Sequence, residues 1–121
     1  MPTSSDITRC EEASEVLNRI GDKWTVLIVV ALSNKPRRFN EIKRYITGIS
    51  HQMLTRTLKN LVRDGLVDRT VFDTVPPQVE YRLSELGQSL SQVLKELANW
   101  AQENSKSVLL SRASYDAENA K

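Results

Sequence analysis

Residues 50–63, SHQMLTRTLKNLVR, carry polar side chains whose hydrogen-bonding chemistry suits a nucleic acid. Arg can donate two parallel hydrogen bonds to guanine, Gln can pair with adenine, and Thr can offer a hydroxyl or a methyl group to a base edge. On a helix of about 100° per residue these side chains gather on one face, which has no acidic residue to balance them. This face carries Gln52, Arg56, Lys59 and Arg63, with Thr55 at its margin.

The opposite face of the same helix is apolar. Leu54, Leu58, Leu61 and Val62 fall in one arc of the projection, and we expect this arc to pack against the core. A charged outer face can also serve only to keep a surface helix soluble, which is its ordinary role. The missing acidic residues favour recognition of a polyanion instead.

Position along the helix predicts a role for each polar residue. The first turns of a helix that enters a major groove lie deepest, so Gln52, Thr55 and Arg56 are the candidates for reading bases. Free N–H groups at the helix start favour an anion, and residues farther along or on flanking elements can reach phosphates. The predicted contacts to the DNA backbone are Arg37, Arg38, Lys43, Ser50, His51, Lys59, Arg63 and Arg69.

The distribution of charge supports a polyanion partner. The formal net charge is only +2. Residues 35–70, however, carry 9 Lys and Arg against 3 Asp and Glu, a local charge of +6, whereas residues 1–34 (3 against 5) and 71–121 (5 against 7) are each at −2. Such a basic stretch points to nucleic acid more strongly than the overall charge does.

Apolar residues three or four apart predict helices in the first half of the chain. Residues 22–34 are apolar almost all round, which is typical of a short central core helix, although the β-branched run Val26–Val30 fits a buried strand equally well. Very short connections make neighbouring helices cross each other. The predicted helices cover residues 10–20, 22–34 and 51–66, and a further helix within residues 34–46 follows the break at Pro36 and begins just after Arg37 and Arg38.

After Gly65 the period changes to two. Residues 66–72 and 78–84 alternate apolar and polar side chains, and the prolines between them predict a hairpin tip. Helices, a hairpin and a final helix make a winged helix-turn-helix, a mainly α fold with a small β-hairpin. In this fold one helix can enter a major groove about 12 Å wide while the hairpin reaches the neighbouring backbone.

The last predicted helix carries an apolar stripe, from Leu86 to Trp100, that is longer than one small core requires. A second copy of the chain is the simplest cover for it. We therefore predict one domain over residues 1–110, with dimerisation helices at 10–20 and 85–110. Residues 111–121 are predicted to form a polar tail, for which disorder is one expectation.

The chain has a single cysteine and a single histidine, which limits the disulfides and catalytic sites that it can form. One cysteine excludes an intramolecular disulfide, and Cys10 and His51 lie in different predicted elements. No glycine-rich phosphate loop or acidic cluster occurs, so we expect no enzyme activity, no metal and no cofactor. The N-terminus lacks an apolar signal core, and the longest apolar run, Val26–Leu32, is far below the roughly 20 residues that cross a bilayer. We expect a cytoplasmic protein without membrane contact.

Four segments together resemble the HxlR-type transcriptional regulators, winged-helix relatives of the MarR group. The resemblance spans about residues 10–100 and implies a homodimer whose terminal helices form the interface. It also implies two recognition helices that read a palindromic operator, with half-sites about one DNA turn apart, and repression as the family habit. A winged helix that binds proteins without specific DNA binding is the alternative. The segments are CEEASEVLNRIGDKWTVLIVVAL (10–32), RRFNEIKRYITGIS (37–50), MLTRTLKNLVRDGLVDR (53–69) and VPPQVEYRLSELGQSL (75–90).

Cys10 matches the N-terminal cysteine with which several members of that family sense electrophiles or oxidants. A thiol near a helix start gains thiolate character from the dipole, and Arg9 adds positive charge, but Glu11 and Glu12 oppose this effect. The resemblance thus implies a redox sensor at Cys10, with a small electrophile or oxidant as effector. A small residue packed under the dimer interface is the other reading of Cys10.

Overall fold

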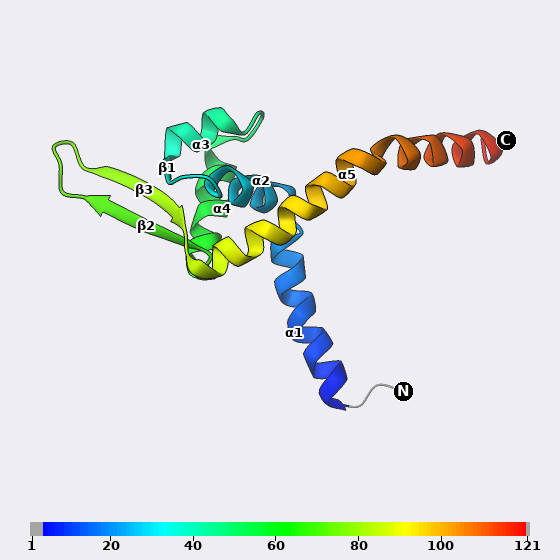
Figure 1. Ribbon diagram of the computed structural model, residues 1–121, viewed down its shortest axis with the longest axis horizontal. Helices are drawn as coiled ribbons and strands as arrows, with labels where there is room; N and C mark the ends of the chain where they lie inside the picture. Colours follow the sequence, from blue (N-terminus) through cyan, green and yellow to red (C-terminus); the bar gives the residue numbers. More distant parts are fainter. Residues whose placement is uncertain (1–3, 121) are drawn as a thin grey trace.

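The computed structural model describes residues 4–120, with side chains from residue 11 onward. Five helices and a small sheet surround one core within these residues, and Figure 1 shows α1 and the far half of α5 leaving the body in different directions, away from the β2–β3 hairpin. This is the predicted winged helix-turn-helix, mainly α with a β-hairpin. In chain order the elements are α1 (Ser4–Ile20), α2 (Lys23–Leu32), β1 (Arg37–Arg38), α3 (Phe39–Tyr45), α4 (His51–Arg63), β2 (Val67–Phe72), β3 (Gln78–Leu83) and α5 (Glu85–Glu118).

The segment that could have been a strand is the central helix α2. The Asp22 carboxylate caps it by accepting a hydrogen bond from the Trp24 N–H at 3.1 Å. Ile28 and Val29 are completely buried, and α2 contacts α3, α4, α5 and β3. A segment that is apolar on all sides suits this position, because neighbours surround it and cover the β-branched residues whatever their intrinsic preference.

The sheet has three antiparallel strands in the order β1–β3–β2, one more than the predicted hairpin. The additional strand β1 consists of two residues, Arg37 opposite Tyr81 and Arg38 opposite Glu80. Two residues are too few to show a period, and their partners lie far away in sequence. α3 begins at Phe39, directly after Arg37 and Arg38, as the sequence predicted.

Two glycine turns enclose α4. Gly48 has φ +87° and precedes Ser50, whose Oγ accepts a hydrogen bond from the Met53 N–H at 3.0 Å and caps the helix. Gly65 has φ +76° after the helix, where the Gly65 N–H donates to the Val62 carbonyl and the Leu66 N–H to the Leu61 carbonyl. This pair of bonds is the Schellman ending, which needs a left-handed residue.

Both terminal helices are longer than the apolar pattern predicted. α1 begins at Ser4 instead of residue 10, and α5 continues to Glu118, through the segment predicted as a polar tail. Residues 111–118 contain neither Gly nor Pro, and Ala, Arg and Glu are good helix formers, so no local signal ends the helix there.

Close packing at Gly87, near the start of α5, reverses the usual effect of a glycine-to-alanine change. Inside a helix that change normally stabilises by about 0.5–1 kcal/mol. Here the new Cβ would collide with the backbone carbonyl oxygen of Leu66, so we expect Gly87→Ala to destabilise by about 1–3 kcal/mol. Urea unfolding at equal protein concentration measures this, with the exposed Gln88→Ala as control. A stabilised Gly87→Ala variant would contradict the close approach of α5 to this turn.

Candidate nucleic-acid interface

α4 has one buried face and one exposed face, as predicted. Leu54, Leu58 and Leu61 are at most 2% exposed. Thr57, which the sequence did not single out, is buried beside them and donates a hydrogen bond to the Met53 carbonyl at 2.8 Å. The prediction was wrong for Val62, which is 36% exposed, because it lies at the edge of the apolar arc and faces a groove beside the sheet.

The outer face of α4 consists of exposed polar side chains without acidic partners. Gln52, Thr55, Arg56, Lys59 and Arg63 are all exposed. Among residues 11–120, the ion pairs are Arg19–Asp64 and Glu80–Arg82, so none of them involves a cation of α4. The Thr55 hydroxyl donates to the His51 carbonyl at 2.9 Å, which leaves its methyl group and its oxygen lone pairs for a ligand.

The start of α4 offers N–H groups to an anion. The Ser50 Oγ already accepts the Met53 N–H, and its hydroxyl proton can still be donated to a phosphate, whose oxygens only accept. The exposed His51 ring lies against the Phe39 ring, with centroids 4.7 Å apart and planes at 51°. The first N–H groups of a helix have no intrahelical partner, so this end can bind a phosphate.

Arg37 and Arg38, both predicted to contact DNA, have partners within the protein. The Arg37 Nε donates to the Ala31 carbonyl at 2.7 Å, and its guanidinium lies 4.5 Å above the Tyr45 ring centroid. The Arg38 guanidinium donates to the Gln78 side-chain oxygen, and its backbone N–H donates to Glu41. Arg37 therefore fixes β1 to the end of α2, a role that the sequence did not reveal.

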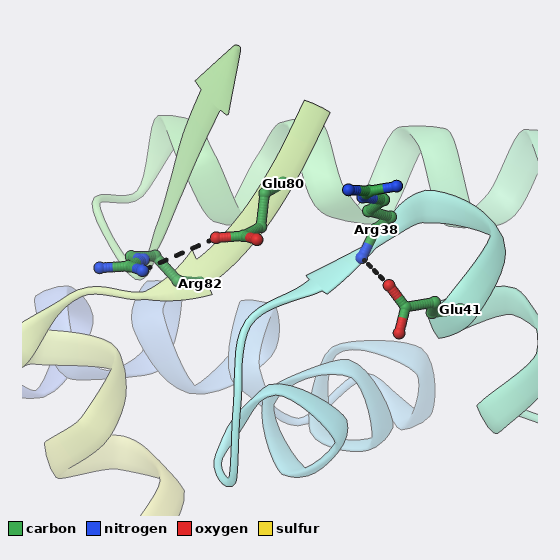
Figure 2. A network of polar contacts seen from close by, with 4 residues as sticks. All are labelled: Arg38, Glu41, Glu80 and Arg82. Atoms are coloured by element: carbon green, nitrogen blue, oxygen red, sulfur yellow. Dashed lines mark hydrogen bonds and ion pairs between the residues drawn. The ribbon is translucent and has the colours of Figure 1, made fainter. Parts of the chain in front are cut away.

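Carboxylates lie close to Arg38 as well. Figure 2 shows Arg38 on β1 near Glu41, and on the neighbouring strand Glu80, which pairs with Arg82 at 3.6 Å. Lys43 is exposed in the last turn of α3.

A groove of about 530 Å³ between α4 and the sheet brings several predicted residues together. Arg69 reaches it from β2, where it is paired with Tyr81 of β3. Phe39 and Tyr81 were not predicted as site residues, because apolar patterns give no sign of a groove formed by distant segments. The groove is lined by Phe39, His51, Thr55, Leu58, Lys59, Val62, Arg69 and Tyr81.

The terminal helices α1 and α5 expose apolar side chains. A second cavity, of about 570 Å³, lies between α1 and α5, next to the 3.2 Å ion pair between Arg19 and Asp64.

Trp24 packs against the core, whereas Trp100 is exposed. Cys10 belongs to α1, but its side chain lies outside the described residues. The apolar residues that are more than half exposed on the two helices include Val16, Leu17, Leu86, Val93, Leu97 and Trp100.

Within the part of the chain that the structure describes, no helix is long and apolar enough to cross a membrane. The described side chains also form no group of three or more His, Cys, Asp or Glu that could hold a metal ion.

A winged helix-turn-helix with an unbalanced cationic helix defines a class, the transcriptional regulators that act on DNA. The chain belongs to the HxlR-like helix-turn-helix family, whose model matches residues 19–108. It is therefore a transcriptional regulator and not an enzyme.

Known proteins that are similar in sequence or structure support this family assignment. An uncharacterised HTH-type transcriptional regulator of Bacillus subtilis, YkvN, is 47% identical over 81 residues, 67% of this chain and 69% of that one. The structure of a putative transcriptional regulator, ytfH from Salmonella typhimurium, superposes with TM-score 0.77 at 39% identity, over 84% of this chain and 90% of that one. The redox regulator HypR in its reduced form superposes with TM-score 0.74 at 36% identity, over 83% of this chain and 98% of that one.

The internal partners of Arg37 predict a stability role that Lys43 lacks. Arg37→Ala removes a charged hydrogen bond to the Ala31 carbonyl and the contact with Tyr45, and we expect it to lower the free energy of unfolding by about 1–2 kcal/mol. The exposed Lys43→Ala should change it by less than about 0.5 kcal/mol. Urea denaturation of the two variants compares them. Equal effects would show that Arg37 is not a structural residue.

Proposed function

We propose that the protein is a sequence-specific repressor that binds a palindromic operator in double-stranded DNA as a homodimer. The observation that carries this proposal is the outer face of α4, where Gln52, Thr55 and Arg56 are exposed on the first turns and no carboxylate balances the cations. Their side chains are those that read base edges in the major groove. The local charge of residues 35–70 adds electrostatic attraction that does not depend on sequence.

Base reading and phosphate binding separate along α4, so two variants should behave differently. Arg56→Ala should cost about 1–3 kcal/mol of operator binding and relax the choice at one base position. Lys59→Ala should weaken binding to every duplex alike, because phosphates carry no sequence information. Selection of bound duplexes from a random pool, followed by affinity measurements on selected and random DNA, tests both variants.

The wild-type protein provides the reference for this experiment. Its affinity for the selected operator should exceed that for random DNA by about 10³-fold or more and fall steeply as salt rises. A protein without either behaviour would be an interaction module and not a DNA-reading repressor. Equal losses on both duplexes for both variants would refute the assignment of Arg56 to base reading.

The homodimer is proposed from the apolar sides of α1 and α5. Leu86, Val93, Leu97 and Trp100 recur along one side of α5 and are each more than half exposed. Soluble monomers rarely expose such a continuous stripe, and a two-fold pair of α1 and α5 helices would cover it while placing two copies of α4 on one duplex. Sedimentation equilibrium measures the assembly, and a monomer at micromolar concentration would refute it.

Oxidation of Cys10 is proposed as the signal, since the structurally similar HypR is a redox regulator. Diamide would take two electrons and two protons from two Cys10 thiols, one from each protomer, and leave one intersubunit disulfide. The new bond would bias the spacing of the two α4 helices. Operator affinity should then change by a factor in the usual allosteric range, about 5- to 150-fold.

Cys10→Ser tests the sensor cleanly, because it removes the only thiol in the chain. In the wild type, diamide should produce a covalent dimer on a non-reducing gel and shift operator affinity, and dithiothreitol should reverse both changes. The Cys10→Ser variant should bind the operator as reduced wild type does and ignore diamide. A wild-type protein whose operator affinity is insensitive to diamide, or a variant that still responds, would eliminate Cys10 as the sensor.

A further inference from the structure

The pocket between α1 and α5 is formed within one chain, and most of its lining is apolar. Its volume of about 570 Å³ lies within the range of about 300–1,000 Å³ that is usual for sites that enclose a drug-sized molecule. Three segments form it, namely the last turns of α1, the turn after α4 and the first half of α5. The apolar lining consists of Val16, Ile20, Leu66, Leu86, Leu90 and Val93.

Three charged side chains line the pocket as well. Arg19 and Asp64 offset each other in their ion pair at 3.2 Å. Glu15 lies one turn before Arg19 on α1, and it takes part in neither of the ion pairs between described side chains. Two carboxylates and one guanidinium leave the pocket with a net charge of −1. Its charge therefore complements a cation, and its apolar surface complements a hydrocarbon ring or chain.

The pocket adjoins the turn that ends the recognition helix. Asp64 and Leu66 flank Gly65, which has the left-handed conformation, and the Leu66 carbonyl accepts the Ser84 N–H at the start of α5. A molecule in the pocket therefore touches α1, α5 and the end of α4 at once. In the proposed dimer the angles between these elements set the distance between the two copies of α4.

We propose that this pocket binds a small amphipathic cation, an apolar ring or chain that carries an amine, and that its occupancy changes operator affinity. The apolar part lies on Ile20, Leu66 and Leu90, and the ammonium group faces Glu15. The amine acts by binding one arrangement of α1, α5 and the turn more tightly than another. Only this effect on DNA rests on the proposed function, because binding of the amine itself requires no operator.

A matched pair of probes, 1-naphthylmethylamine and 1-naphthoate, tests the site on the full-length protein. The two share one ring system and carry opposite charges at neutral pH. Isothermal titration calorimetry without DNA should give about fivefold or higher affinity for the amine. Glu15→Lys changes the charge of the pocket from −1 to +1, so it should reverse this preference. Glu15 is exposed, so the fold should survive the substitution.

Glu103→Lys is the matched control, because it changes the net charge of the chain by the same amount. Glu103 is exposed on α5 about 15 Å beyond Val93, farther than the screening length of about 8 Å at physiological salt. This variant should leave both affinities unchanged. The proposed site is overturned if the two lysine variants behave alike, or if neither probe binds because helices of a second copy fill the pocket.

The effect on DNA has its own measurement. Saturating amine should change the operator affinity of wild type by about fivefold or more, and bound operator should change the amine affinity by the same factor, because coupling between two sites is reciprocal. Amine binding with the expected charge preference but without any change in operator affinity would refute the role as effector. If wild type does not distinguish operator from random DNA, the proposed function fails, and calorimetry on Glu15→Lys still decides whether the site exists.

Discussion

The burial of Leu54, Leu58 and Leu61 against the core is the contact on which the rest of the structure depends. A 13-residue helix is marginal in water by itself, and α4 has to hold several cations on one side without carboxylates to offset them. Burial of the leucine side fixes the rotation of the helix, and the 3.6-residue period then sends Gln52, Arg56 and Arg63 outward. The exposed cationic face is therefore a product of tertiary packing.

The turn after α4 connects this helix to the base of the wing and to the start of α5. The Leu66 carbonyl accepts the Ser84 N–H at 3.0 Å, and the Ser84 hydroxyl donates to the Gly65 carbonyl at 2.6 Å while it caps α5. Gly87 leaves room for the same carbonyl of Leu66. The end of α4, the base of the wing and the start of α5 thus share one small set of backbone atoms. A change in the angle of α5 must move this turn.

The sequence alone predicted the elements that depend on local pattern, and it failed where distant segments meet. Capping by Ser50, the leucine face of α4 and the β-hairpin follow from periods and turn chemistry within about 20 residues. Strand β1 depends on pairing with Tyr81 and Glu80, some forty residues away. The inward role of Arg37 and the exposure of Val62 likewise depend on Ala31, Tyr45 and the sheet, so the groove beside α4 could not be predicted.

The proposed dimer surface and the proposed DNA surface lie on different elements, α1 and α5 on one side and α4 with the wing on the other (Figure 1). The last turn of α1 is one place where a change in this helix can be passed on to α4. The Arg19–Asp64 ion pair is there, but both side chains are about one-third exposed, and such pairs contribute at most about 1 kcal/mol. Ile20 is partly buried against the core, and the Gly21 N–H donates to the Leu17 carbonyl at 2.8 Å. Apolar packing and backbone geometry, more than the ion pair, must couple α1 to α4.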